Sequence, residues 1–145
     1  MKADYSKISP TAKIAAYWKS LSDIPYAKEI AEAVDAQQTT KEILGEKIVT
    51  MARFSPPIME ARYKAINIGI SESRVDNILE LACGLSPRGL TLAADNKVYV
   101  GSDLPEILSE TAPVITSIAE RLNIPANKLH YQPVNVLSKD ELGEA

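Results

Sequence analysis

Two short segments of the chain carry residues whose types and spacing suit ligand binding. The first is a turn at residues 82–86, which follows the apolar run 78–81 and precedes a helix start signal. Ala82 and Gly84 let the backbone approach a ligand closely, because their side chains are minimal or absent. The second is Asp103, which follows another apolar run and lies 19 residues after Gly84.

This spacing indicates an adenosine-containing ligand. An acid about 20 residues after a glycine turn is typical of ribose binding, since a carboxylate can accept from both hydroxyls of a diol. The strict dinucleotide motif G-x-G-x-x-G would need glycine at 82, 84 and 87, where this chain has Ala82, Gly84 and Pro87. Pro87 also removes a backbone donor, so a nicotinamide-binding domain is the weaker alternative.

The second half, residues 76–145, predicts the elements that position these segments. Three apolar runs are typical of buried strands, at residues 78–81, 97–101 and 128–134. Helix start signals follow the first two, at Ser86-Pro87 and Leu104-Pro105. The alternation predicts a parallel α/β sheet, whose carboxyl edge is where ligands bind. We expect Pro113 to kink or split the second of these helices.

The first half, residues 1–75, predicts a layer of four short helices. They are expected after Ser9-Pro10, after Pro25, at a capping box in 39–42, and after Pro56-Pro57. Apolar residues recur at helical spacing, and the aromatic side chains on these stripes are expected in the core: Tyr17, Trp18 and Tyr63. The chain thus predicts a helical segment over 1–75 followed by a partial sheet domain over 76–145.

Composition excludes several classes of protein. Hydrophobic residues are 46% and charged residues 24% of the 145 residues, as in ordinary globular proteins. A net charge of −3 predicts binding neither to nucleic acid nor to an anionic membrane. One cysteine, Cys83, and one histidine, His130, exclude a disulfide and a Cys- or His-rich metal site. Without a signal peptide or a long apolar run, the chain is expected in the cytoplasm.

Segments 79–89 and 99–105 resemble the first and second motifs of class I S-adenosylmethionine-dependent methyltransferases. More narrowly, they resemble the leucine carboxyl methyltransferase group, which includes polyketide O-methyltransferases of the tetracenomycin type. Segment 61–66 is similar to the family segment that leads into the sheet. The resemblance implies a helical layer followed by the first part of a Rossmann-like sheet, a truncated methyltransferase fold, because the family's chains are longer.

The resemblance also implies a cofactor site. The turn at 82–86 would pass beneath the methionine part of S-adenosyl-L-methionine, and Glu80 would organise that turn. Asp103 would take the ribose hydroxyls, with Leu104 beside the adenine. Arg62 would pair with the cofactor carboxylate through its planar fork. The implied cofactor-binding residues, which include an asparagine near the adenine amine, are Arg62, Glu80, Ala82, Gly84, Asp103, Leu104 and Asn135.

The function implied is methyl transfer from a sulfonium to a carboxyl or hydroxyl oxygen of a small molecule or peptide. This reaction needs alignment more than acid–base help, and the sequence indicates no catalytic base and no metal ligand. In the family's sheet the first strand is central, so the strand at 78–81 would have an open edge. A second copy, a partner chain or the helical layer is expected to cover it.

Other interpretations stay open. The capping box at 138–141 is followed by only four residues, which predicts an incomplete chain, and a non-catalytic remnant or assembly subunit is the alternative function. Several candidate residues also have purely structural interpretations. Glu80 could pair with a neighbouring helix, Asp103 could cap the helix at Pro105, and Arg62 could be a solvated helix residue. Cys83 is expected to be a buried turn residue.

Overall fold

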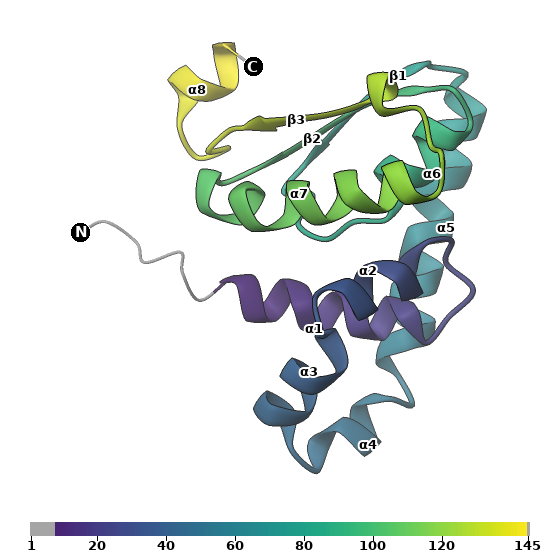
Figure 1. Cartoon of the computed structure of the whole chain (residues 1–145), viewed down its shortest axis with the longest axis vertical. Helices are drawn as coiled ribbons and strands as arrows, with labels where there is room; N and C mark the ends of the chain where they lie inside the picture. Colours follow the sequence, from purple (N-terminus) through teal and green to yellow (C-terminus); the bar gives the residue numbers. More distant parts are fainter. Residues whose placement is uncertain (1–7, 145) are drawn as a thin grey trace. The chain divides into compact units, whose positions relative to one another are not determined.

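The computed structural model describes residues 8–144, which form eight α-helices, one 3-10 turn and three strands. The protein is therefore mixed α/β, as the sequence predicts. The chain divides into two compact units (Figure 1). Ser9–Val75 is helical, and the unit that begins at Asp76 contains the sheet.

The helical unit has a small apolar core. Trp18 and Tyr63 are buried, and Tyr63 packs in a cluster with Ile24 and Ala27, which confirms the core prediction for these two aromatic residues. Burial of such side chains stabilises short helices that are marginal in isolation. The helices of this unit are α1 (Ile8–Ser20), α2 (Ala27–Ala33), α3 (Ala36–Leu44), α4 (Lys47–Met51) and α5 (Ser55–Ser73).

The predicted start of the third helix is wrong. Thr39, the first residue of the expected capping box, already lies inside α3, where its N–H donates to the Asp35 carbonyl at 3.2 Å. A residue whose N–H is bonded one turn back lies inside a helix and cannot be its N-cap. The chain then leaves the helix at Gly45, whose φ is +52°, and α4 begins two residues later. The expected single helix is therefore two helices.

The sheet unit alternates strands and helices as predicted. Its three strands are parallel, in the order β1-β2-β3, with Leu79 beside Val100 and Val100 beside His130. Figure 1 shows α6 and α7 on the same side of this sheet. The elements are β1 (Asn77–Leu81), α6 (Arg88–Ala94), β2 (Val98–Asp103), α7 (Pro105–Arg121), β3 (Leu129–Pro133) and α8 (Lys139–Glu144).

Helix α7 continues through Pro113, so the predicted split is wrong. A proline inside a helix costs about 3 kcal/mol, because it removes one backbone hydrogen bond and crowds the preceding turn. Pro113 is exposed, whereas Ile107, Ile115 and Ile118 of the same helix are buried. Burial of this apolar face offsets the local cost and keeps the helix whole.

Close packing on one face of the sheet depends on two glycines. A Cβ added at Gly89 of α6 would lie 2.7 Å from the Tyr99 ring, and one added at Gly101 would lie 2.8 Å from the Tyr131 ring. The two rings meet edge to face, with centroids 6.4 Å apart. The opposite face is more open, since Leu79 remains 53% exposed there. Within the sheet unit, the face that carries Tyr99 and Gly101 is therefore the more closely packed of the two.

Candidate functional site

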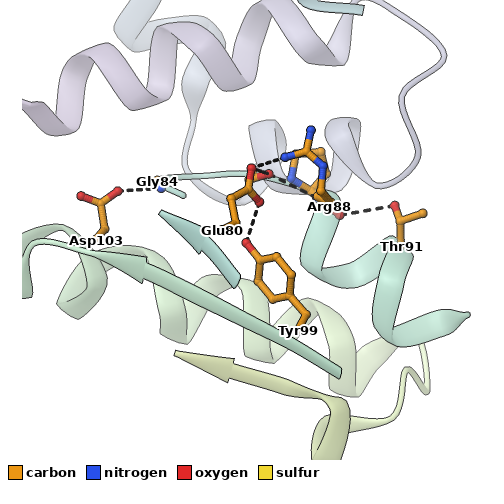
Figure 2. Close-up of polar contacts among 8 residues, drawn as sticks. Glu80, Gly84, Arg88, Thr91, Tyr99 and Asp103 are labelled. Atoms are coloured by element: carbon orange, nitrogen blue, oxygen red, sulfur yellow. Dashed lines mark hydrogen bonds and ion pairs between the residues drawn. The ribbon is translucent and has the colours of Figure 1, made fainter. Parts of the chain in front are cut away.

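The two segments singled out in the sequence meet at the carboxyl edge of the sheet. The Asp103 carboxylate accepts from the Gly84 N–H at 2.8 Å and from the Leu104 N–H at 2.8 Å. The first of these bonds is drawn in Figure 2. The Cys83 N–H donates to the Ser102 carbonyl at 2.9 Å, which extends the pairing of the two strands into the turn. The turn after β1 and the end of β2 therefore form one rim.

The turn is held in an uncommon backbone conformation. Ala82 has φ +54° and Gly84 has φ +49°, both in the left-handed region. Glycine adopts this region freely, whereas a residue with a Cβ pays about 1–2 kcal/mol. Ala82 is exposed and Gly84 is half-buried, so both remain near the surface of the rim. A strained residue in an exposed turn is a common feature of ligand-binding loops.

Asp103 keeps acceptor capacity after its backbone bonds are made. A carboxylate has about four lone-pair positions, and the two backbone N–H groups use one on each oxygen. The side chain does not cap α7, because the N-cap residue is Leu104 and no side-chain cap bond forms there. Asp103 is half-buried, so the remaining positions face a partly open edge. The residue can hold the turn and accept further donors together.

Glu80 is half-buried and lies at the centre of a polar cluster beside this rim, and the other members of the cluster are buried. Its Oε1 accepts from the Ser86 hydroxyl at 3.2 Å and pairs with the Arg88 guanidinium, and its Oε2 accepts from the Tyr99 hydroxyl at 2.7 Å (Figure 2). The side chains of Glu80 and Arg88 are 19% and 7% exposed. The cluster ties β1, the turn, α6 and β2 together. Glu80 thus pairs with a neighbouring helix and also fixes the turn.

The other ionisable groups near the rim stay neutral around pH 7. Burial, and then the charges of Asp103 and Glu80, raise the pKa of the Cys83 thiol to about 12. Burial is also the main cause that raises the pKa of Tyr99 and of Tyr131, with the Glu80 charge adding to both. A protonated buried thiol is a poor nucleophile, which fits a structural turn residue. Neither the thiol nor the phenols provide a base at neutral pH.

Asn135 lies at the same edge of the sheet but is engaged locally. The preceding residue, Val134, donates its N–H to the Asp103 carbonyl at 2.9 Å. The Asn135 side chain accepts from the Leu137 N–H at 3.0 Å, and its own N–H donates to Glu141 at 2.9 Å. The amide oxygen predicted to face an adenine amine is therefore used in a turn.

Helix α8 begins where the last capping box predicts, with half of the box formed. The Ser138 hydroxyl accepts from the Glu141 N–H at 3.4 Å, as an N-cap side chain does. The Glu141 carboxylate bonds the Asn135 N–H in place of the Ser138 N–H. The acidic residue of the box therefore fastens the helix to the chain segment that leaves β3.

Two candidates lie away from the rim. Arg62 is exposed on α5 in the helical unit, so its pairing with a cofactor carboxylate stays a prediction. His130 is exposed near the start of β3, with its Nε2 3.1 Å from the Asn127 carbonyl oxygen, as expected of a strand-surface residue. The rim itself brings together Ala82, Gly84, Asp103 and Leu104, with Glu80 beside it and Asn135 at the same edge.

Sequence reasoning missed Arg88 and Tyr99, the two side-chain partners of Glu80. The nearest signal is Gly89, two residues beyond the expected third glycine of a dinucleotide motif. That glycine allows close packing of helix on strand, and Gly89 does the same here against Tyr99. A search for a displaced third glycine would have pointed to the helix and strand that carry both partners.

The helical unit has a cavity of its own. Its volume is about 370 Å³. Tyr17 is half-buried and lines it, so the prediction that Tyr17 belongs to the core is wrong. The lining mixes apolar and charged side chains of α1, α2, α3 and the segments that join them, namely Tyr17, Ser20, Leu21, Lys28, Ala31, Glu32, Asp35 and Gln37.

Comparison with known proteins leaves the family open. No protein-family model matches the chain, and no curated protein is significantly similar to it in sequence. No helix within residues 8–144 has both the length and the apolar character that crossing a membrane requires. Over the same residues, no three His, Cys, Asp or Glu side chains gather in a way that could hold a metal ion.

Proposed function

We propose that this chain binds S-adenosyl-L-methionine at the rim and forms the cofactor-binding part of an O-methyltransferase. The observation that supports this most is the hydrogen bond from the Gly84 N–H to the Asp103 carboxylate. It joins the two segments that resemble methyltransferase motifs at one edge of a parallel sheet, the edge at which ligands of such sheets bind. A nucleoside site of this kind needs a turn of small residues and a carboxylate that lies beside it.

The residues of the rim fit an adenosyl group. Each Asp103 oxygen accepts one backbone N–H and retains a second lone pair, so a ribose diol can bind without displacing the turn. Leu104 follows directly and offers an apolar surface to an adenine. The left-handed residues Ala82 and Gly84 keep the turn free of bulky side chains where the rest of the ligand would pass. Arg62 is the proposed partner of the cofactor carboxylate.

The bound cofactor would supply an electrophilic methyl group, and the chain would contribute binding and orientation. A carboxylate acceptor is already an anion and needs no base, whereas a phenol has an ordinary pKa of about 10. Among the groups described beside the turn, Cys83, Tyr99 and Tyr131 all have a raised pKa and cannot act as a base near pH 7. The site therefore favours a carboxyl group of a small molecule or peptide as the acceptor.

Calorimetric titration of the full chain with S-adenosylhomocysteine tests the proposal. We expect micromolar binding to the wild type and at least about tenfold weaker binding to Asp103→Ala, because hydrogen bonds to a charged group contribute about 1.5–3 kcal/mol. Asp95→Ala is the matched control, since it removes an exposed carboxylate from the same unit. Equal affinity of Asp103→Ala and the wild type would contradict the site. Preference for a dinucleotide would favour the nicotinamide alternative.

A non-catalytic remnant or assembly subunit is the second candidate. Both Asp103 oxygens already bond backbone N–H groups, and Glu80 already holds Ser86 and Arg88, so the turn is ordered without a ligand. A rim maintained only for folding would look the same. No binding of S-adenosylhomocysteine by the wild type would favour this candidate.

A further inference from the structure

The two edges of the sheet differ in how they are protected. The β3 edge has Pro133, which lacks a backbone donor, and exposed polar side chains at His130 and Gln132, which are features that discourage strand pairing. The β1 edge has no proline and no lysine, and its one charge, Glu80, is already paired with Arg88. The β1 edge is therefore the one suited to a further strand.

Backbone geometry shows which groups of β1 face outward. The Val98 N–H of β2 donates to the Asp76 carbonyl at 2.8 Å, and Val98 lies beside Asn77. Because alternate residues of a strand direct their N–H and C=O groups to opposite sides, those of Asn77, Leu79 and Leu81 point away from β2. Within the part of the chain that the structure describes, no strand pairs with these groups.

We propose that β1 pairs antiparallel with β1 of a second copy of this chain, about a two-fold axis at Leu79. This register sets Leu79 opposite Leu79 of the other copy, and Asn77 opposite Leu81. Each opposed pair exchanges both of its N–H···O bonds, so every outward backbone group of the strand is used. The result is one continuous six-stranded sheet with the order 3-2-1-1-2-3.

The strand itself favours a second copy over an unrelated partner. An interface with two-fold symmetry needs a self-complementary surface. Leu79 is the central residue of β1, and its backbone N–H and C=O groups point away from β2. When the strand is reversed about Leu79, it therefore presents the same pattern of backbone donors and acceptors. On the open face, Leu79 and Leu81 are 53% and 44% exposed, and pairing would bring the two Leu79 side chains side by side. No like charges come opposite each other, because Glu80 would face Ile78.

The first test measures association of the full chain by sedimentation over a range of concentrations. We expect a concentration-dependent dimer for the wild type. Leu79→Arg sets two like charges opposite each other and should raise the dimer dissociation constant at least about tenfold. His130→Arg is the matched control, an exposed position on the same face at the β3 edge, and should leave it unchanged. A monomer at every concentration, or an undisturbed Leu79→Arg dimer, would overturn the proposal.

The second test fixes the register and does not depend on a destabilising charge. Opposed residues in this register have Cα atoms about 5.5 Å apart, within the range of a disulfide. Leu79→Cys should therefore form a covalent dimer on mild oxidation, whereas His130→Cys should not, because five strand spacings separate the two copies by about 24 Å. Native Cys83 is buried and stays protonated, so it adds no background. Equal cross-linking of both variants, or none of either, would overturn the register.

Discussion

The two carboxylates beside the turn are held in opposite ways. The Glu80 cluster consists of Glu80, Ser86, Arg88 and Tyr99, and its acceptor oxygens are occupied by side chains. The Asp103 rim consists of Ala82, Gly84, Asp103 and Leu104, and its carboxylate is occupied by backbone N–H groups. Both carboxylates are half-buried, but Glu80 is paired with the buried guanidinium of Arg88, whereas Asp103 has no cationic partner among its hydrogen bonds and keeps unused lone pairs.

This difference separates stability from binding. A carboxylate paired with a buried guanidinium is costly to change, since its loss leaves the partner's charge in a poorly solvated place. A half-buried carboxylate that accepts only backbone N–H groups costs less to change, because water can replace part of the lost hydrogen bonding. We therefore expect substitutions in the Glu80 cluster to act mainly on folding, and those in the Asp103 rim to act mainly on ligand affinity.

The largest expected effect is that of Glu80→Gln. Neutralising one member of a buried ion pair should lower the free energy of unfolding by about 3 kcal/mol. Asp103→Asn is the matched amide substitution and should cost about 1 kcal/mol, since one oxygen acceptor remains for two backbone donors. Urea unfolding of the two variants measures both quantities. Equal losses would show that the two carboxylates have the same structural role.

A double variant checks that the Arg88 pair is the cause. Replacing both members of a buried ion pair with groups of similar size is often neutral, whereas removing one is not. Glu80→Gln combined with Arg88→Met should therefore be more stable than Glu80→Gln alone. A double variant whose loss is the simple addition of the two single losses would assign the cost to other contacts of Glu80.

The next effect is the pH dependence that Cys83 gives to folding. Its pKa is about 12 in the folded protein against an ordinary 9.0, so the folded state holds the proton more tightly. This stabilisation is complete below pH 9 and is lost as the pH rises towards 12. At pH 10 the loss relative to pH 7 is about 1.4 kcal/mol. Cys83→Ala should remove the part of the decline that begins near pH 9.

Two tyrosines set the control for this measurement. Tyr99 and Tyr131 have a raised pKa for the same main cause, burial, and their ordinary pKa is 10.0. Their contribution has the same sign and begins about one pH unit higher, so it should persist in Cys83→Ala. Urea unfolding at intervals from pH 7 to about 11 distinguishes the two parts. An unchanged curve in Cys83→Ala would show that the thiol is not buried in solution.

The pKa of the Cys83 thiol also measures how strongly each of the two carboxylates acts on the turn. After burial, the Asp103 charge is the larger electrostatic cause of the raised Cys83 pKa, and the Glu80 charge is the smaller. Asp103→Asn should therefore lower the Cys83 pKa more than Glu80→Gln does, since each removes one negative charge near the thiol. The pH dependence of thiol alkylation in each folded variant reports the pKa. The reverse order would show that the Glu80 charge acts on the Cys83 thiol more strongly than the Asp103 charge does.

The sheet and its rim were predictable because they follow from local patterns. Apolar runs separated by helix start signals gave β1, β2 and β3 at the expected places. The contact of Gly84 with Asp103 follows from the rule that carboxyl ends of parallel strands share an edge. Residues at the ends of neighbouring strands meet whatever the details of packing, so their spacing in the sequence was sufficient.

The Glu80 cluster was not predictable in the same way. Arg88 and Tyr99 reach Glu80 from a helix and a neighbouring strand, and no sequence period links such positions. The predicted capping box at 39–42 failed for a related reason. Thr40, the second residue of the box, is fully buried and its hydroxyl bonds the Ala36 carbonyl one turn back, so tertiary packing favours a helix that runs through the box. Patterns predict elements, whereas partners across elements depend on the packed core.

The smallest effect concerns residues with positive φ. Of the Glu80 cluster and the Asp103 rim, only the rim contains such residues. Ala82 and Gly84 have positive φ, and no member of the Glu80 cluster does. Ala82→Gly removes a left-handed cost of about 1–2 kcal/mol but adds unfolded-state freedom of about 0.5–1 kcal/mol. A net gain in stability of about 0.5 kcal/mol should follow, and Gly84→Ala should lose about 1 kcal/mol.

Because Ala82→Gly should raise stability and Gly84→Ala should lower it, the two variants together test the backbone conformation of the turn. Ala82→Gly keeps the Gly84 N–H bonded to Asp103, so its affinity for S-adenosylhomocysteine should stay within about twofold of the wild type. If Ala82→Gly instead lowers stability, the turn in solution does not have the left-handed residue at 82. The Gly84–Asp103 contact would then lack the backbone geometry that brings its donor into place, and the rim would not be a preformed site.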